Sequence, residues 1–154
     1  MPTHWVEPDD MVSMAGTKLP SSDWMTVEQD RINTFADCTE DHQFIHIDEE
    51  AAAKSPFGGT IAHGFLTLSL LTKLSSENSI GVKGVVMGVN YGIDKLRFLA
   101  PVQAGKRIRA HTEVLSVDRK DANRFLVKTA VTVEIEGEET PALYAEWLGM
   151  QFIA

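Results

Sequence analysis

The chain has 154 residues, 44% apolar and 23% charged, with 14 Lys and Arg against 22 Asp and Glu, which gives a formal net charge of −8. This length suits one domain, the single cysteine excludes an intrachain disulfide, and the acidic balance argues against a nucleic-acid partner. Because no basic segment precedes Lys18 and no apolar run approaches the ~18 residues of a membrane span, we expect a cytoplasmic protein without a membrane partner.

The first elements along the chain are expected to be short. Residues 1–22 hold three prolines and no sustained period, so they predict an N-terminal arm that precedes one domain over residues 23–154. Residues 23–27 are rich in β-formers and predict a strand. The acidic residues that follow this strand predict the start of a helix, whose apolar spacing ends by Thr39. A polar loop is predicted after it. Asp48 is suited to cap a further short helix over residues 49–54.

A buried helix is predicted in the middle of the chain. Residues 55–60 contain Pro and two Gly and predict a break, after which residues 61–74 contain no Pro. Their apolar side chains lie almost all round a helix, which is typical of a buried one. Long β-rich segments follow and predict strands that wrap this helix, an α+β arrangement with a curled antiparallel sheet. The predicted strands cover residues 82–89, 93–99, 107–118, 124–136 and 143–153.

Two blocks of sequence gather ionisable residues and glycines, and both resemble a known family. Residues 41–48, DHQFIHID, resemble the signature G-D-x-N-P-I-H-x-D of the (R)-specific enoyl-CoA hydratases, the MaoC-like dehydratase family. Residues 56–69, PFGGTIAHGFLTLS, resemble the second block of that family, in which a His-Gly pair opens the central helix. The match is nearest to the nodulation-protein-N-like branch. Two blocks at the right separation are far more specific than one short motif.

The resemblance implies a fold and a reaction. The fold would be a single hot-dog domain, an antiparallel sheet wrapped around a long central helix, and the assembly a homodimer. The reaction would be the reversible hydration of trans-2-enoyl-CoA to (R)-3-hydroxyacyl-CoA, with no cofactor because coenzyme A is part of the substrate. By resemblance, the acid–base pair is Asp41 with His46, the backbone N–H of Gly64 is the oxyanion donor, and the further substrate contacts are expected from Gln43, His63, Ser69 and Arg97.

These residue types suit the chemistry. Hydration of an enoyl thioester needs a base to activate water at Cβ and an acid to protonate Cα, and a carboxylate with an imidazole can supply both. The developing enolate oxygen needs a preorganised donor, for which a backbone N–H at a helix N-terminus is well suited. His42 and His46 have the i, i+4 spacing of a metal pair, but no third ligand is obvious, so we expect no metal.

Anionic coenzyme A would need cations on an acidic protein. The densest cluster contains Lys95, Arg97, Lys106, Arg107 and Arg109. Alternate residues of a strand share a face, so Lys95 with Arg97, or Arg107 with Arg109, would present paired charges to phosphates. A solvated strand face is the alternative interpretation.

Glu40 stands where the family signature has Gly. Glycine there would permit a positive φ, which Glu tolerates poorly. Glu40 therefore favours one alternative, a non-catalytic acyl-CoA-binding protein or accessory subunit. A thioesterase is a second alternative and ranks low, because that reaction normally needs a carboxylate on the central helix and residues 60–74 contain none.

Overall fold

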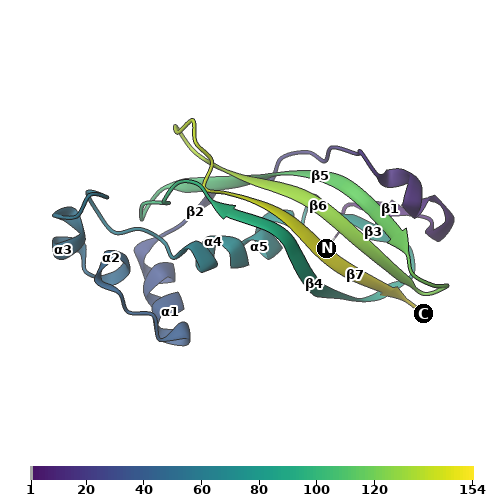
Figure 1. Cartoon of the computed structure of the whole chain (residues 1–154), viewed down its shortest axis with the longest axis horizontal. Helices are drawn as coiled ribbons and strands as arrows, with labels where there is room; N and C mark the ends of the chain where they lie inside the picture. Colours follow the sequence, from purple (N-terminus) through teal and green to yellow (C-terminus); the bar gives the residue numbers. More distant parts are fainter. Residues whose placement is uncertain (1) are drawn as a thin grey trace.

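The computed structural model describes residues 2–154. A five-stranded antiparallel sheet, in the order β2-β5-β6-β7-β4, curls around the short helices α4 and α5, and a second, two-stranded sheet pairs β1 with β3 (Figure 1). The elements in chain order are β1 (His4–Val6), the 3-10 helix η1 (Pro8–Met14), β2 (Met25–Thr26), α1 (Gln29–Thr39), α2 (Phe44–Ile47), α3 (Glu49–Ala53), α4 (Gly64–Ser69), α5 (Leu71–Ser75), β3 (Ile80–Val82), β4 (Val85–Phe98), β5 (Arg107–Arg119), β6 (Arg124–Ile135) and β7 (Leu143–Ile153).

The main core lies between the concave face of the sheet and the two central helices. Strand β6 contributes to this core because its apolar side chains alternate with polar ones. Val131, Val133 and Ile135 therefore point to one face of the sheet, and all three are fully buried. They pack in one cluster with Leu66 and Leu70 from the helices. The architecture is the single hot-dog α+β fold, as the sequence predicted.

The central helix differs from the prediction in extent. Residues 61–74 do not form one helix, because Ile61 is extended and bridges Gln103, so that the helix begins only at Gly64. Leu70 then separates α4 from α5. Phe65, expected on a buried helix, is 66% exposed.

Two strands were predicted over 82–89 and 93–99, but β4 runs without a break from Val85 to Phe98, and Val82 belongs to β3. Residues around Gly92 stay paired with β7 across register shifts, since a bulge absorbs an extra residue without ending the strand. Strand β4 forms one edge of the sheet.

The segment predicted as an arm packs against the sheet. Strand β1 runs parallel to β3, with His4 paired to Ile80, and Met11 of η1 is fully buried. Among residues 2–154, no helix combines the length and the hydropathy of a bilayer span.

Helices α1, α2 and α3 lie together at the end of the molecule where α4 begins (Figure 1). Helix α1 ends at Thr39, and Asp48 Oδ1 caps α3 by accepting from the Ala51 N–H at 2.9 Å, as the sequence predicted. Helix α2 was not predicted: residues 44–47 follow the polar loop, and four residues are too few to show a helical period. This helical layer carries the first of the two sequence blocks.

Candidate active site

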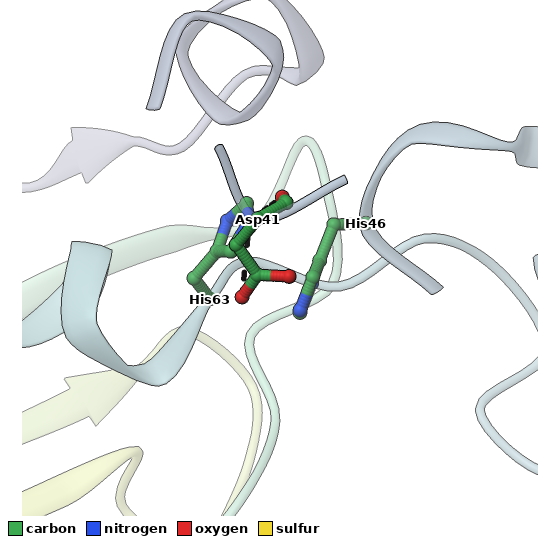
Figure 2. A group of neighbouring side chains, drawn as sticks. All are labelled: Asp41, His46 and His63. Carbon is green, nitrogen blue, oxygen red and sulfur yellow. Dashed lines mark hydrogen bonds and ion pairs between the residues drawn. The ribbon is translucent and has the colours of Figure 1, made fainter. Parts of the chain in front are cut away.

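Three side chains from the two sequence blocks meet at the start of α4. Asp41 lies in the loop between α1 and α2, His46 lies on α2, and His63 occupies the N-cap position of α4. One side-chain oxygen or nitrogen from each lies within 4.8 Å of the other two (Figure 2). The fold therefore joins the two blocks into one cluster.

The imidazole of His46 is buried and held in one tautomer. Its Nδ1 lies 2.7 Å from the carbonyl oxygen of Ile61. A carbonyl only accepts, so Nδ1 carries the hydrogen and Nε2 keeps its lone pair in the neutral ring. Burial lowers the pKa of His46 below its ordinary value of 6.5; the hydrogen bond to Ile61 opposes this, His63 adds to the lowering and Asp41 opposes it. The ring is thus set up as a base near neutral pH.

Gln29, which no sequence motif indicates, supports His46. Gln29 Nε2 donates to the His46 carbonyl at 2.7 Å, and Thr60 Oγ1 donates to Gln29 Oε1 at 2.5 Å. These two hydrogen bonds, which we call the Gln29 clamp, connect α2 to the segment that leads into α4. No local pattern indicates it, because Gln29 and Thr60 are 31 residues apart.

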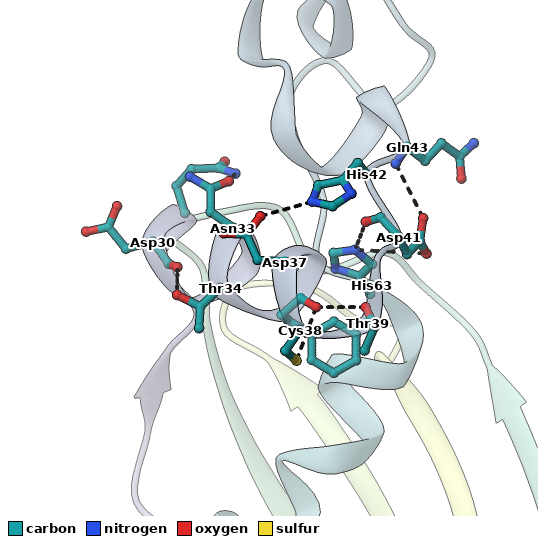
Figure 3. Close-up of polar contacts among 12 residues, drawn as sticks. Asp30, Asn33, Thr34, Asp37, Cys38, Thr39, Asp41, His42, Gln43 and His63 are labelled. Atoms are coloured by element: carbon teal, nitrogen blue, oxygen red, sulfur yellow. Dashed lines mark hydrogen bonds and ion pairs between the residues drawn. The ribbon is translucent and has the colours of Figure 1, made fainter.

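The carboxylate of Asp41 is half-exposed and is directed toward the space beside the two histidines (Figure 2). Its Oδ1 accepts from the backbone N–H of Gln43 at 3.3 Å, which fixes the turn into α2. The side chain of Gln43, an expected substrate contact, points away from His63 (Figure 3).

Gly64 and His46 line one pocket of about 380 Å³, together with Thr67 and Phe98. Gly64 is the first residue of α4, and the first amides of a helix have no intrahelical acceptor. A Cβ built at Gly64 would lie 3.0–3.2 Å from three atoms of the Phe98 ring. The absence of a side chain at this position therefore leaves room for the Phe98 ring.

Ser69 and Arg97 lie outside this pocket. Ser69 Oγ donates to the Phe65 carbonyl at 2.7 Å and lines a different pocket, with residues 90–93 of β4. Arg97 is exposed and its Nη1 donates to the Leu96 carbonyl at 2.7 Å. Because Leu96 packs against the main core, the alternation of β4 directs Arg97 to the opposite face of the sheet.

Three of the five cations in this cluster are paired with glutamates. Arg107 forms a bidentate pair with Glu136, and Arg109 Nε lies 2.7 Å from Glu134 Oε2. Lys106 Nζ lies 3.8 Å from Glu138. For Arg107 and Arg109 the solvated-face interpretation fits better than a phosphate site.

The geometry of the cluster suits proton transfer better than metal binding. The rings of His46 and His63 are stacked, with centroids 3.8 Å apart and 23° between their planes. Their in-plane lone pairs therefore do not converge as a tetrahedral ion requires. His42, considered as a metal partner for His46, instead pairs with Asp37 at 2.9 Å (Figure 3).

Glu40 ends α1 in the left-handed conformation, with φ 59° and ψ 25°. Within residues 2–154 it is the only non-glycine residue with a positive φ. The glycine that the family signature has at this position predicts such a backbone conformation. The conformation is costly for a residue with a Cβ, by about 1–2 kcal/mol.

We expect Glu40→Gly to stabilise the protein by about 1 kcal/mol, because glycine adopts this conformation without the steric cost. The midpoint of thermal unfolding should rise by about 2–4 °C for a domain of this size. Glu40→Ala is the control, since it removes the charge but keeps the Cβ. Equal melting temperatures for the two variants would show that the charge, not the backbone, is responsible.

Comparisons with known proteins agree with this architecture. Residues 10–137 match the family described as MaoC like domain. The chain is 47% identical to nodulation protein N of Rhizobium leguminosarum bv. viciae, over 90% of this chain and 87% of that protein. It is also 47% identical to 3-hydroxyacyl-thioester dehydratase Z of Mycobacterium tuberculosis (strain ATCC 25618 / H37Rv), over 89% and 90% of the two chains.

A solved structure extends the likeness to the fold. The X-ray structure of the monoamine oxidase regulatory protein from Archaeoglobus fulgius superposes with a TM-score of 0.74 and 30% identity, covering 91% of each chain. The family match spans most of the chain, and the two relatives cover nearly all of it. The chain therefore belongs to the MaoC-like dehydratase family of hydro-lyases.

Proposed function

We propose that this protein catalyses the reversible (R)-specific hydration of trans-2-enoyl-CoA to (R)-3-hydroxyacyl-CoA. One observation carries the proposal: a carboxylate, Asp41, and a neutral imidazole, His46, meet beside a pocket that also contains the start of α4 at Gly64. The dehydratase named among the relatives supports the same class of substrate.

In this proposal the acid–base pair acts on one water molecule. The free Nε2 of His46 and the carboxylate of Asp41 hold the water, remove a proton as its oxygen bonds to Cβ, and return a proton to Cα. The N–H of Gly64 donates to the thioester oxygen, on which negative charge develops as the Cβ–O bond forms. Coenzyme A leaves with the product as part of it, so no separate cofactor takes part.

The test is a steady-state assay with crotonyl-CoA that follows the loss of enoyl absorbance. The product is expected to be the (R)-3-hydroxy thioester, so an (S)-specific 3-hydroxyacyl-CoA dehydrogenase added to the mixture should form no NADH. Brisk NADH formation would contradict the stereochemistry. Tight binding of crotonyl-CoA without turnover would favour the accessory-subunit alternative.

We also propose that the protein is a homodimer joined through the free edge of β4. This edge exposes apolar side chains over residues 86–93, including Val89 and Tyr91, which are 41% and 62% exposed. A long, apolar and unpaired edge strand favours pairing with another strand. A second copy related by a twofold axis presents the same edge in the antiparallel sense.

Val89→Lys should therefore reduce the mass measured by light scattering from twice 17.0 kDa to 17.0 kDa, because a charge on an edge strand opposes pairing. Val12→Lys is the matched control, since Val12 is 51% exposed on η1 and should leave the dimer intact. A wild-type protein that is monomeric would rule out this interface.

A further inference from the structure

His63 is a buried polar residue that the acid–base chemistry does not use. It is 3% exposed, and its Nε2 lies 3.0 Å from the main-chain oxygen of Asp41 and 4.0 Å from Asp41 Oδ2. The carbonyl accepts, so Nε2 carries the hydrogen and Nδ1 keeps the lone pair of the neutral ring. This Nδ1 is buried and, within residues 2–154, lacks a hydrogen-bond partner. The ring thus offers no free donor to a substrate.

The ring of His63 contacts both halves of the site. It stacks on His46 at 3.8 Å between centroids and packs at a tilt against Phe35 of α1 at 4.9 Å. Although His63 is the N-cap residue of α4, its side chain makes no capping bond to that helix and instead reaches across to Asp41. It directly precedes Gly64, so one residue links the acid–base pair to the proposed oxyanion donor.

We propose that His63 is a positioning residue that acts through Asp41 and His46. Its Nε2–H fixes the main chain at Asp41, and its ring fixes the plane of His46. This inference rests on the proposed hydration reaction and replaces the expectation that His63 contacts the substrate. Small displacements of reacting groups, of about 1 Å, are known to cost as much as ~10²-fold in rate.

The electrostatics of the site agree with this role. The titratable groups that act on His46 are His63, which lowers its pKa, and Asp41, which raises it; burial is the largest cause of the lowering. Removal of the stacked ring would admit water and remove one of the lowering effects, so the pKa of His46 should rise. If His46 must be unprotonated to act, the acidic limb of kcat against pH would then move to higher pH.

Two variants separate the functions of the ring and of its donor. His63→Gln keeps an amide donor near the position of Nε2 without a ring, and His63→Phe keeps a ring without a donor. We expect each to lower kcat by about 10–10²-fold with KM changed less than about threefold. In His63→Gln the acidic limb should also move upward. Leu74→Ala is the control: Leu74 is 4% exposed on α5, so its loss should lower the melting temperature but leave kcat and the pH profile unchanged.

The outcomes distinguish this inference from the proposed function. Unchanged kcat and an unmoved acidic limb, or a raised KM with unchanged kcat, would overturn the positioning role. NMR titration of the His46 ring needs no substrate, so it reports on positioning even if the wild-type protein fails to hydrate crotonyl-CoA. A higher titration midpoint in His63→Gln would then support positioning while the proposed function fails, and an unmoved midpoint would overturn positioning. If His63→Phe does not fold, the kcat, the KM and the pH profile of His63→Gln decide whether His63 is a positioning residue.

Discussion

Replacement of Asp41 by Asn, or of His46 by Gln, is expected to lower kcat for crotonyl-CoA hydration by at least ~10²-fold, because each removes one member of the proposed acid–base pair. Asp41→Asn keeps an oxygen that can accept from the Gln43 N–H, so the turn should survive. His46→Gln loses the bond from Nδ1 to Ile61, so its melting temperature must be measured beside its activity.

The double variant provides the sharper comparison. Two groups that act as a unit on one water give effects that are far from multiplicative, so Asp41→Asn combined with His46→Gln should be little worse than either alone. Near-wild-type turnover in a folded single variant would contradict the assignment of that residue. Multiplicative losses would indicate two independent roles.

The second large effect is expected at Gly64. Gly64→Val should lower kcat/KM by about 10²–10³-fold if the valine side chain prevents the thioester oxygen from reaching the backbone N–H of residue 64. Loss of one oxyanion donor typically lowers the rate by that factor. The structure adds a second cause, because a Cβ here would press on the Phe98 ring at 3.0–3.2 Å. Valine itself carries only a modest penalty in a helix.

Phe98→Leu in the Gly64→Val background separates the two causes. Removal of the ring should restore the melting temperature, since Phe98 is 47% exposed and its loss costs little packing, while kcat/KM should stay low. The Phe98→Leu single variant is the control for its own effect on the pocket. Full recovery of activity in the double variant would mean that Gly64 serves packing alone and that the oxyanion donor lies elsewhere.

The sequence predicted most of the fold because the strong signals are local. The alternation over residues 124–136 predicted β6 to within one residue, and Asp48 predicted the start of α3. The errors arose where tertiary pairing overrides local pattern. Ile61 is apolar enough for a helix but bridges Gln103, and β7 holds β4 together through Gly92.

For the candidate site, the sequence supplied candidate residues but not the contacts that support them. Asp41, His46 and Gly64 were predicted from the two family blocks. The fold brings Asp41 close to His46 and places His46 and Gly64 in the lining of one pocket. Their support depends on distant contacts that no local pattern reports, such as the Gln29 clamp. The face of β4 on which Arg97 lies was likewise not predicted, because it depends on Leu96 packing against the main core.

The ion pairs across β5 and β6 have a consequence for how an anionic substrate approaches. Because Arg107 and Arg109 are held by Glu136 and Glu134, they form no local basic patch to oppose the field of a protein whose net charge is −8. Acyl-CoA and the protein should then repel each other at long range. Raising the ionic strength from 0.01 to 0.1 M shortens the screening length from about 30 to about 10 Å, so kcat/KM for crotonyl-CoA should rise. The uncharged thioester crotonyl-pantetheine should show no such rise, and a fall for crotonyl-CoA would instead reveal a basic phosphate-binding surface.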